Sequence, residues 1–468
     1  MTAPSRTVLA SRPVEPYKVA MRAVTRALLA CAALTACGVD DAVEGGPVLL
    51  VGIDGLEPSL VAELIEAGRL PNLARFANEG VLGRLETLDD TYSPVVWTTV
   101  ATGQRTADHG IDFFFEPSSM RPYTSESRRV PALWNLVSDA GRSVDCVGWW
   151  VTWPAEPIQG RMLASYAAQA QAQVIWKSSY TDELREQTWP DDLWDVLRED
   201  VLFASQPESV WAELEGRFPL PEGPLGDPAD TDRMTLDLAW TLAADRSNTR
   251  VTERFLGDAP ADLVMTYLAV PDVAGHRFWR YHAPEEFAFE VNGPSVEAFG
   301  DWMALAYEDA DAALGRMLEA IDERWTVVVV SDHGMHADPN TLETPETLQS
   351  GHHLDAPPGV VGILGPGIEP GGARLDVEPL GSVYDVAPFV LRRLGLARPE
   401  HWPAVEAGCR LDAFLSAAWS EEHPARTCPP PDRDWLSEHP RTHPPRIPNE
   451  SSNEDFMRAF ENLGYFER

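Results

Sequence analysis

Apolar and polar residues follow two recurring patterns along the chain. Short apolar runs rich in valine, isoleucine and leucine are typical of strands buried on both faces of a parallel sheet. Such runs occupy residues 48–53, 81–88, 143–149, 262–270, 326–330 and 359–364. Between them, apolar residues recur every three or four positions, the spacing of a helix with one buried face. We expect helices at residues 57–68, 70–80, 95–102, 131–140, 231–256, 301–321 and 383–394.

The alternation of strands and helices predicts an α/β fold, with a mostly parallel central sheet sandwiched by helices. The periodicity changes over residues 165–230, where short amphipathic helices carry several tryptophans. We interpret this segment as an inserted helical, Trp-rich cap. The expected division is a leader (1–36), a tether (37–46), the α/β domain in two parts (47–164 and 231–400) around the cap (165–230), and a Pro-rich C-terminal extension (401–468).

Polar residues cluster where the predicted strands end. Asp54 follows the first strand, Asp272 and His276 follow the strand at 262–270, and Asp332 and His333 follow the valine-rich strand. Ligands of such sheets bind beyond the carboxyl ends of the strands. Each cluster also has an ordinary explanation, because Asp54 suits a turn and Asp272 with His276 suits the first turn of a helix.

The three clusters together favour a metal site. Buried carboxylates of like charge repel one another and are not left without a partner. Neighbouring Asp and His side chains supply the oxygen and nitrogen ligands that zinc accepts. Divalent cations would therefore balance the charge. Near these clusters Ser93 precedes Pro94 at the start of a predicted helix, and we expect the serine to be its N-cap.

The net charge of −36 changes the expected partners. It argues against binding to nucleic acid and against docking on an anionic lipid surface. A composition bias shared by many proteins of the same organism is the simpler explanation of the acidity.

The N-terminus has the features of an export signal. Arg22 and Arg26 precede an apolar run at residues 27–36 that is too short to span a bilayer. The run ends in Leu-Thr-Ala-Cys-Gly, which resembles a bacterial lipobox with Cys37 as the lipidated residue. This resemblance implies an exported lipoprotein, anchored to the membrane on its periplasmic or cell-surface side. The alternative is a disordered tail with a chance cysteine.

Six motifs carry a wider resemblance. They are VGIDG (51–55), SPVVWTTVATG (93–103), DHGI (108–111), PDVAGH (271–276), SDHGM (331–335), and SGHH before GVVGILGPG (350–367). In this order they resemble the alkaline-phosphatase superfamily, in its branch of type I phosphodiesterases and nucleotide pyrophosphatases. The resemblance covers residues 48–396 and leaves out the cap and the tail.

The resemblance implies a centre with two Zn²⁺ ions and a serine nucleophile. It places Asp54, Ser93, Asp332 and His333 on one metal ion. It places Asp272, His276 and His353 on the other, with the adjacent His352 as the alternative to His353. Ser93 occupies the position of the nucleophile, where a bound metal would lower the pKa of its hydroxyl.

The leading hypothesis is a lipid-anchored hydrolase of phosphate esters, with diesters as the expected substrates. The substrate would be a small phosphate ester or a lipid headgroup. Alternatives with the same core are a phosphonate hydrolase, a phosphomonoester hydrolase and a lipid-directed phosphotransferase. The non-enzymatic alternative is a catalytically inactive, metal-binding surface lipoprotein.

Overall fold

The computed structural model describes residues 45–116, 121–165, 167, 186–202, 207–355, 357–430 and 435. The predicted leader, Cys37 and the tether up to residue 44 lie outside these residues, as do large parts of the predicted cap and of the C-terminal extension. The leader, the cap and the domain boundaries therefore stay predictions. None of the described helices combines the length and the apolar character that crossing a membrane requires.

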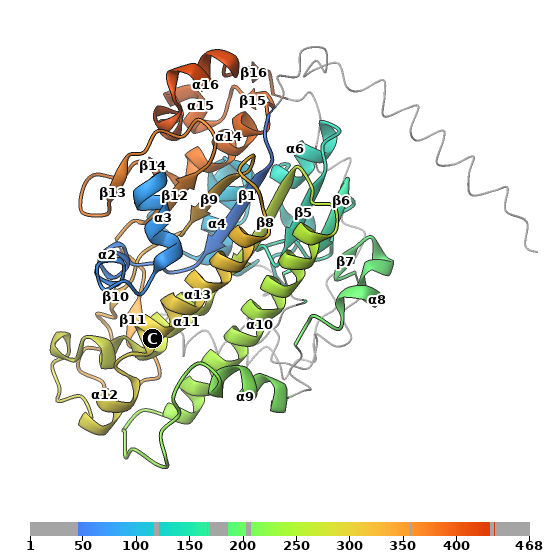
Figure 1. The fold of residues 1–468 in the computed structure, drawn as a ribbon. Helices are drawn as coiled ribbons and strands as arrows, with labels where there is room; N and C mark the ends of the chain where they lie inside the picture. The colour runs from blue at the N-terminus through green and yellow to red at the C-terminus, as the bar shows by residue number, and fades with distance from the viewer. Residues whose placement is uncertain are drawn as a thin grey trace, which may run out of the picture. The chain divides into compact units, whose positions relative to one another are not determined.

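A ten-stranded sheet forms the centre of the described fold, with the order β13-β2-β12-β9-β1-β8-β5-β6-β7 and β14 paired to β2 (Figure 1). Its longer strands are β1 (Val48–Ile53), β2 (Val81–Glu86), β5 (Val144–Val147), β6 (Gly160–Leu163), β8 (Leu263–Leu268), β9 (Thr326–Val330) and β12 (Gly359–Leu364). Strands β9, β1, β8, β5 and β6 run parallel to one another. The predicted mostly parallel α/β fold is confirmed.

The sheet differs from a purely parallel one at its two sides. Strand β12 runs antiparallel to both β9 and β2, and β7 (Thr188–Trp189) runs antiparallel to β6. Two further strands at one edge, β13 (Gly372–Arg374) and β14 (Gly381–Ser382), pair with β2. The strands β6, β7, β13 and β14 were not predicted, because each is too short to form an apolar run of its own. Shorter pairs outside the sheet are β3 (Phe115–Glu116) with β4 (Arg121–Pro122), β10 (His336–Ala337) with β11 (Gly351–His352), and β15 (Arg398–Pro399) with β16 (Thr427–Cys428).

Helices cover both faces of the sheet. The longer ones are α2 (Pro58–Glu66), α3 (Pro71–Glu79), α4 (Ser93–Thr102), α6 (Leu133–Asp139), α9 (Pro207–Glu215), α10 (Thr231–Gly257), α11 (Val270–His282), α12 (Gly293–Phe299), α13 (Trp302–Glu319) and α14 (Val383–Arg393). The shorter ones are α5 (Thr106–His109), α8 (Trp194–Leu197), α15 (Pro403–Ala407) and α16 (Ala417–Glu422). The helices at 231–256, 301–321 and 383–394 are confirmed to within a few residues.

The sheet separates two hydrophobic cores, one on each of its faces, and strand β1 contributes side chains to both. Successive side chains of a strand point to opposite faces of the sheet. Val48 and Leu50 accordingly pack in one core with residues of α4, α6 and α14. Leu49, Val51 and Ile53 pack in the other with residues of α2, α3, α10, α11 and α13. Figure 1 shows α10, α11 and α13 lying across the second face.

Two local predictions are wrong. Ser93 is the first residue of α4, whereas the N-cap is Tyr92, and no side chain caps this helix. The strand predicted at 262–270 is shorter, because β8 ends at Leu268 and α11 already begins at Val270. Asp272 and His276 therefore lie one helical turn apart on α11, on the same face of the helix.

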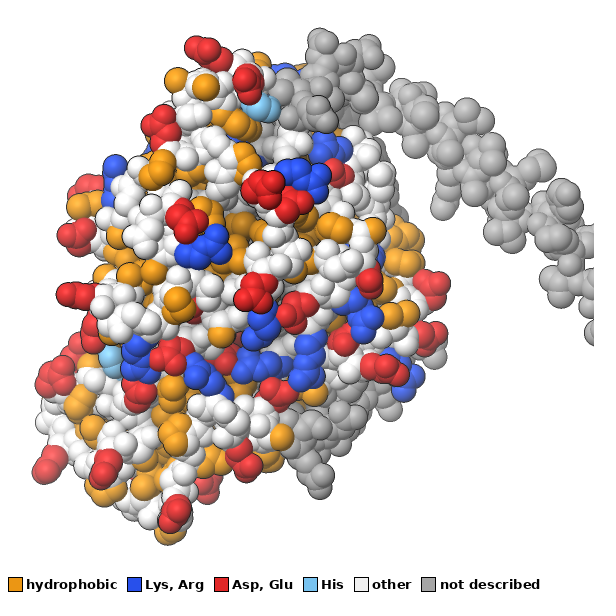
Figure 2. Space-filling model, in the orientation of Figure 1, with side chains coloured by type: hydrophobic (Ala, Val, Ile, Leu, Met, Phe, Trp, Pro, Cys, Tyr) orange, Lys and Arg blue, Asp and Glu red, His pale blue; other side chains and the backbone are white. Residues whose placement is uncertain are grey.

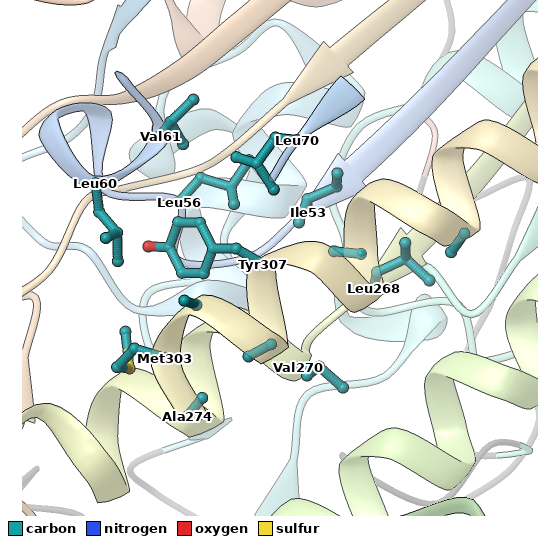
Figure 3. Packing of buried hydrophobic residues seen from close by; sticks show 14 of the residues in the cluster. Ile53, Leu56, Leu60, Val61, Leu70, Leu268, Val270, Ala274, Met303 and Tyr307 are labelled. Carbon is teal, nitrogen blue, oxygen red and sulfur yellow. The ribbon is translucent and has the colours of Figure 1, made fainter. Parts of the chain in front are cut away.

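The loop after β1 is held against α11 and α13. Figure 3 shows Ile53, Leu56 and Tyr307 packed beside Val270 and Leu268. The Tyr307 hydroxyl donates to the Gly55 carbonyl at 3.0 Å and accepts from the backbone N–H of Glu57 at 2.8 Å. Gly55 has a φ of 75°, and a Cβ at this position would lie 2.7 Å from the Asp272 Cα. Only glycine allows the loop to lie this close to α11.

The face shown in Figure 2 carries basic side chains interspersed with acidic ones. Several arginines pair with acids between helices. Arg246 contacts Asp309 at 2.6 Å, and Arg217 contacts Glu308 at 2.6 Å. These ion pairs connect α10 and the segment after α9 to α13.

Candidate metal centre and nucleophile

Asp54, Asp332 and His333, here called the strand-end group, meet at the carboxyl ends of two adjacent strands. Strands β1 and β9 are parallel and in register, with Gly52 opposite Val330, so both end at the same edge of the sheet. All three side chains are buried, and one potential ligand atom from each lies within 4.8 Å of the others. His333 Nε2 is 3.3 Å from Asp54 Oδ1 and 3.3 Å from Asp332 Oδ2.

Hydrogen bonds determine which nitrogen of His333 faces the carboxylates. Its Nδ1 lies 2.9 Å from the carbonyl oxygen of Gly334, so Nδ1 carries the proton and donates it. Burial lowers the pKa of His333, which keeps the ring neutral. Nε2 therefore presents a lone pair to two carboxylate oxygens. Among the described residues, Nε2 and these two oxygens have no hydrogen-bond partner. Three buried acceptors that converge without a donor fit a cation.

Protons are the competitors of such a cation. Burial and the charge of Asp54 raise the pKa values of Asp332 and Asp272 well above their ordinary range. A divalent cation reverses this effect, because it favours the ionised carboxylates. A cation bound at this site would therefore displace protons.

Asp272, His276 and His353, here called the helix-side group, lie next to the first group. His276 Nε2 is 3.5 Å from Asp272 Oδ1, one turn away on α11. The ring of His353 stacks on His333 with centroids 3.8 Å apart, and its centroid is 5.0 Å from that of His276. Asp272, His333 and His353 also offer ligand atoms within 4.8 Å of one another, so His333 lies within reach of both groups.

Different hydrogen bonds distinguish His353 from His352. Thr91 donates its hydroxyl proton to the His353 carbonyl at 2.8 Å, so its oxygen accepts from His353 Nδ1 at 3.1 Å. The ring proton of His353 is therefore on Nδ1, and Nε2 is its unprotonated nitrogen. His352 Nδ1 instead accepts from the backbone N–H groups of His353 (2.9 Å) and Leu354 (2.8 Å), so its proton is on Nε2. Burial lowers the pKa of His352 to about 4, so its ring is neutral at pH 7.

Ser93 is buried at the start of α4, between residues that contact both groups. Two residues before it, Thr91 bonds to His353 of the helix-side group. One turn after it, Trp97 Nε1 donates to Asp54 Oδ2 of the strand-end group at 2.9 Å. The structure thus brings the segment around Ser93 to both groups. Six of the seven residues predicted for the centre are connected by these short distances, and Ser93 lies in the segment between Thr91 and Trp97, which bond to two of the six.

Sequence reasoning missed the residues that support the site. Thr91, Trp97 and Tyr267 bond to predicted ligands. No pattern sets Thr91 and Tyr267 apart from ordinary loop or core residues, and Trp97 lies in the SPVVWTTVATG motif but was not predicted to bond to Asp54. Asp245 on α10 is another: it accepts from the backbone N–H groups of Ala269 (2.9 Å) and Val270 (2.9 Å) at the start of α11. Burial raises the pKa of Asp245 to about 8. Only the fold brings these partners together.

Solved structures of low similarity cover large parts of the chain. Murine ectonucleotide pyrophosphatase / phosphodiesterase 5 is 13% identical, with 79% of this chain and 100% of that chain covered and a TM-score of 0.47. Phosphonoacetate hydrolase from Sinorhizobium meliloti 1021 is 18% identical over 63% of this chain and 58% of that chain, with a TM-score of 0.39. Phosphonate monoester hydrolase from Silicibacter pomeroyi is 14% identical over 79% and 76% of the two chains, with a TM-score of 0.42. No curated protein sequence matches the chain.

A family model provides the stronger comparison. The model of the type I phosphodiesterase / nucleotide pyrophosphatase family matches residues 48–374. This range contains every residue predicted for the centre, and it leaves out Cys37. The predicted resemblance and the predicted enzyme class are confirmed. The chain belongs to the type I phosphodiesterase / nucleotide pyrophosphatase family of phosphoric ester hydrolases.

Proposed function

We propose that the protein is a phosphodiesterase with Ser93 as nucleophile and two divalent cations, expected to be Zn²⁺. The observation that carries this proposal is the convergence of Asp54 Oδ1, Asp332 Oδ2 and His333 Nε2, three buried acceptors without a donor among the described residues. A structural ion pair would supply an arginine or lysine here. Among the described residues, no arginine or lysine contacts these atoms, so we infer that a metal supplies the positive charge.

Each group would hold one cation. In the strand-end group, Asp54, Asp332 and His333 would bind the first, together with the Ser93 oxygen. In the helix-side group, Asp272, His276 and His353 would bind the second. We prefer His353 to His352, because the ring proton of His353 is on Nδ1 whereas that of His352 is on Nε2, and because Asp272, His333 and His353 offer ligand atoms within 4.8 Å of one another.

Bound cations would polarise the phosphoryl oxygens and favour the ionised form of the serine hydroxyl. Ser93 Oγ forms a bond to phosphorus while the bond to the leaving ester oxygen breaks, which gives a phosphoseryl enzyme and an alcohol. Water then attacks phosphorus, releases the phosphate monoester and restores the hydroxyl. Because Ser93 does not cap α4, its hydroxyl is not required by the helix. The positive end of the helix dipole also favours an anion at this position.

The substrate is proposed to be a small phosphate diester or a lipid headgroup. The test compares bis-p-nitrophenyl phosphate with p-nitrophenyl phosphate, on protein of measured metal content. We expect about two metal ions per chain, faster hydrolysis of the diester, and loss of activity on chelation that added Zn²⁺ restores. An active preparation without stoichiometric metal would contradict the proposal. Faster hydrolysis of the monoester would shift it to a phosphomonoesterase with the same centre.

We also propose that the protein is exported and held at the membrane through a lipid on Cys37. The support is the lipobox-like sequence before Cys37, together with the basic and apolar residues that precede it. An anchored enzyme would act at the membrane surface, on soluble esters or on headgroups of neighbouring lipids. Fractionation of the wild-type protein and of Cys37→Ser provides the test.

A further inference from the structure

The two carboxylate oxygens of Asp54 have different surroundings. Oδ2 accepts a hydrogen bond from the Tyr267 hydroxyl at 2.6 Å and a second from Trp97 Nε1 at 2.9 Å. Oδ1 has no hydrogen-bond partner among the described residues and faces His333 Nε2. Burial and the charge of Asp54 raise the pKa of Tyr267, so this hydroxyl keeps its proton and acts as a donor.

The two donors are held rigidly. The indole of Trp97 packs edge to face against Trp149 (centroids 5.1 Å apart) and against Tyr267 (5.3 Å). Trp149 Nε1 also donates to the Trp97 carbonyl at 3.1 Å. Gly52 on β1 makes room for this indole, since a Cβ there would lie 2.7 Å from Trp97 Cζ3. Neither donor can turn away from Asp54 without displacing buried aromatic rings.

Two donors on one oxygen restrict rotation of the carboxylate. They occupy the lone pairs of Oδ2, and Oδ1 then keeps its own lone pairs directed toward His333 and Asp332. Partners behind a metal ligand orient it and reduce the entropy that metal binding costs. Trp97 also lies four residues after Ser93 on the same face of α4, so one side chain connects the nucleophile helix to the ligand.

We propose that Trp97 and Tyr267 are positioning residues, which direct Asp54 Oδ1 toward a cation and hold α4 in register with the strand-end group. This inference rests on the proposed function, because it requires that Asp54 binds metal. Simple core packing is the competing explanation, and it predicts a loss of stability without a specific loss of metal affinity.

The experiment replaces the donors and keeps the rings. Trp97→Phe, Tyr267→Phe and the double variant are compared with two matched controls in the full chain. Tyr123→Phe removes a hydroxyl that lies 2.6 Å from Asp112, and Trp134→Phe removes an indole N–H 2.7 Å from Glu156. Both controls delete a buried aromatic donor to a carboxylate outside the two groups. The readouts are Zn²⁺ affinity, by competition with a chromogenic chelator, and the urea midpoint of the metal-free protein.

We expect each single variant to bind Zn²⁺ about tenfold more weakly and the double variant up to about 100-fold more weakly. The controls should keep wild-type affinity while their urea midpoints fall at least as far. If Trp97→Phe does not fold, Tyr267→Phe alone provides the test. This variant should fold, because the phenyl ring of phenylalanine fills the space of the tyrosine ring. Unchanged affinity in the folded variants, with normal binding by the wild type, would overturn this inference alone. A wild-type protein that binds no divalent cation would overturn the proposed function and this inference with it.

Discussion

Glu156 and Asp54 are both buried carboxylates that accept a hydrogen bond from an indole, yet their surroundings differ. Glu156 Oε2 accepts from Trp134, and its Oε1 accepts from Arg128 at 2.7 Å and from Asn135 at 3.2 Å. Asp54 has donors on Oδ2 only, and its Oδ1 faces the strand-end group. The first carboxylate is fully paired within the protein. Asp54 has further acids as neighbours, which is the arrangement expected of a carboxylate that binds a cation.

This difference separates structural acids from functional ones. Two other buried acids of the described fold pair with arginine: Asp309 contacts Arg246 at 2.6 Å and Asp145 contacts Arg161 at 2.6 Å. A buried charge is kept where a partner offsets its desolvation. Where several acids gather without such a partner, we propose that the partner is a cation from outside the chain. The following predictions test this distinction, from the largest expected effect to the smallest.

Ser93→Ala should lower diesterase activity by on the order of 1,000-fold or more, because it removes the attacking oxygen. It changes neither group's carboxylates or imidazoles, so at least the helix-side metal should remain bound. The free energy of unfolding should change by less than about 1 kcal/mol, since Ser93 does not cap α4. Activity is measured at matched metal occupancy, with Ser93→Thr as the control that keeps a hydroxyl. Near wild-type turnover of Ser93→Ala would assign the attack to water.

The two kinds of acid should respond oppositely when their charge balance is changed. Arg128→Met leaves Glu156 buried without its cation and should cost about 3–5 kcal/mol, with metal affinity unchanged. Burial and the charge of Asp54 disfavour the ionised form of Asp332. At pH values where Asp332 ionises, the metal-free Asp332→Asn protein should therefore be more stable than the wild type, while its Zn²⁺ affinity falls. Urea unfolding in chelator and metal competition measure the two effects. A metal-free Asp332→Asn protein that is less stable than the wild type would show that Asp332 is already paired.

The pH dependence should distinguish the metal-free protein from the loaded one. Burial raises the pKa values of Asp272 and Asp332, so their contribution to stability is complete below the ordinary carboxyl pKa and is lost as pH rises through the folded-state values. Bound metal replaces those protons. Zn²⁺ affinity should therefore increase as pH rises above the ordinary carboxyl range, and protons should be released on binding. Titration in weak buffer with a pH indicator measures the release, and affinity that does not change with pH would contradict it.

Cys37→Ser should have the smallest effect on the enzyme and a large one on its location. Cys37 lies outside the residues that the structure describes, and nothing in either metal group depends on it. The variant should keep wild-type activity and metal content, but leave the membrane fraction for the soluble one. A variant that still sediments with membranes after a high-salt wash would exclude the lipid anchor.

Much of the fold could be predicted, because buried parallel strands are recognised in the sequence as apolar runs. The central strands and the helices α10, α13 and α14 lie where the periodicity placed them, whereas α11 was not predicted. The antiparallel direction of β12 and the short edge strands could not be predicted, since strand direction depends on connections and on pairing partners. The N-cap of α4 was misassigned for a related reason: Ser93 and Pro94 suit either of two starting positions, and packing of the segment around Tyr92 decides between them.

The amino-acid sequence by itself determined which residues form the candidate centre. Asp54, Asp332 and His333 directly follow strands that share one edge of a parallel sheet, and Asp272 and His276 have the spacing of one helical turn. Only the tertiary structure decided how the side chains of these residues are oriented and which ring nitrogens carry protons. The choice between His353 and His352, and the different surroundings of the two Asp54 oxygens, depend on bonds to Thr91, Trp97 and Tyr267. Those partners are between 43 and 262 positions away in the chain, and hydrogen bonds over such separations exist only after folding.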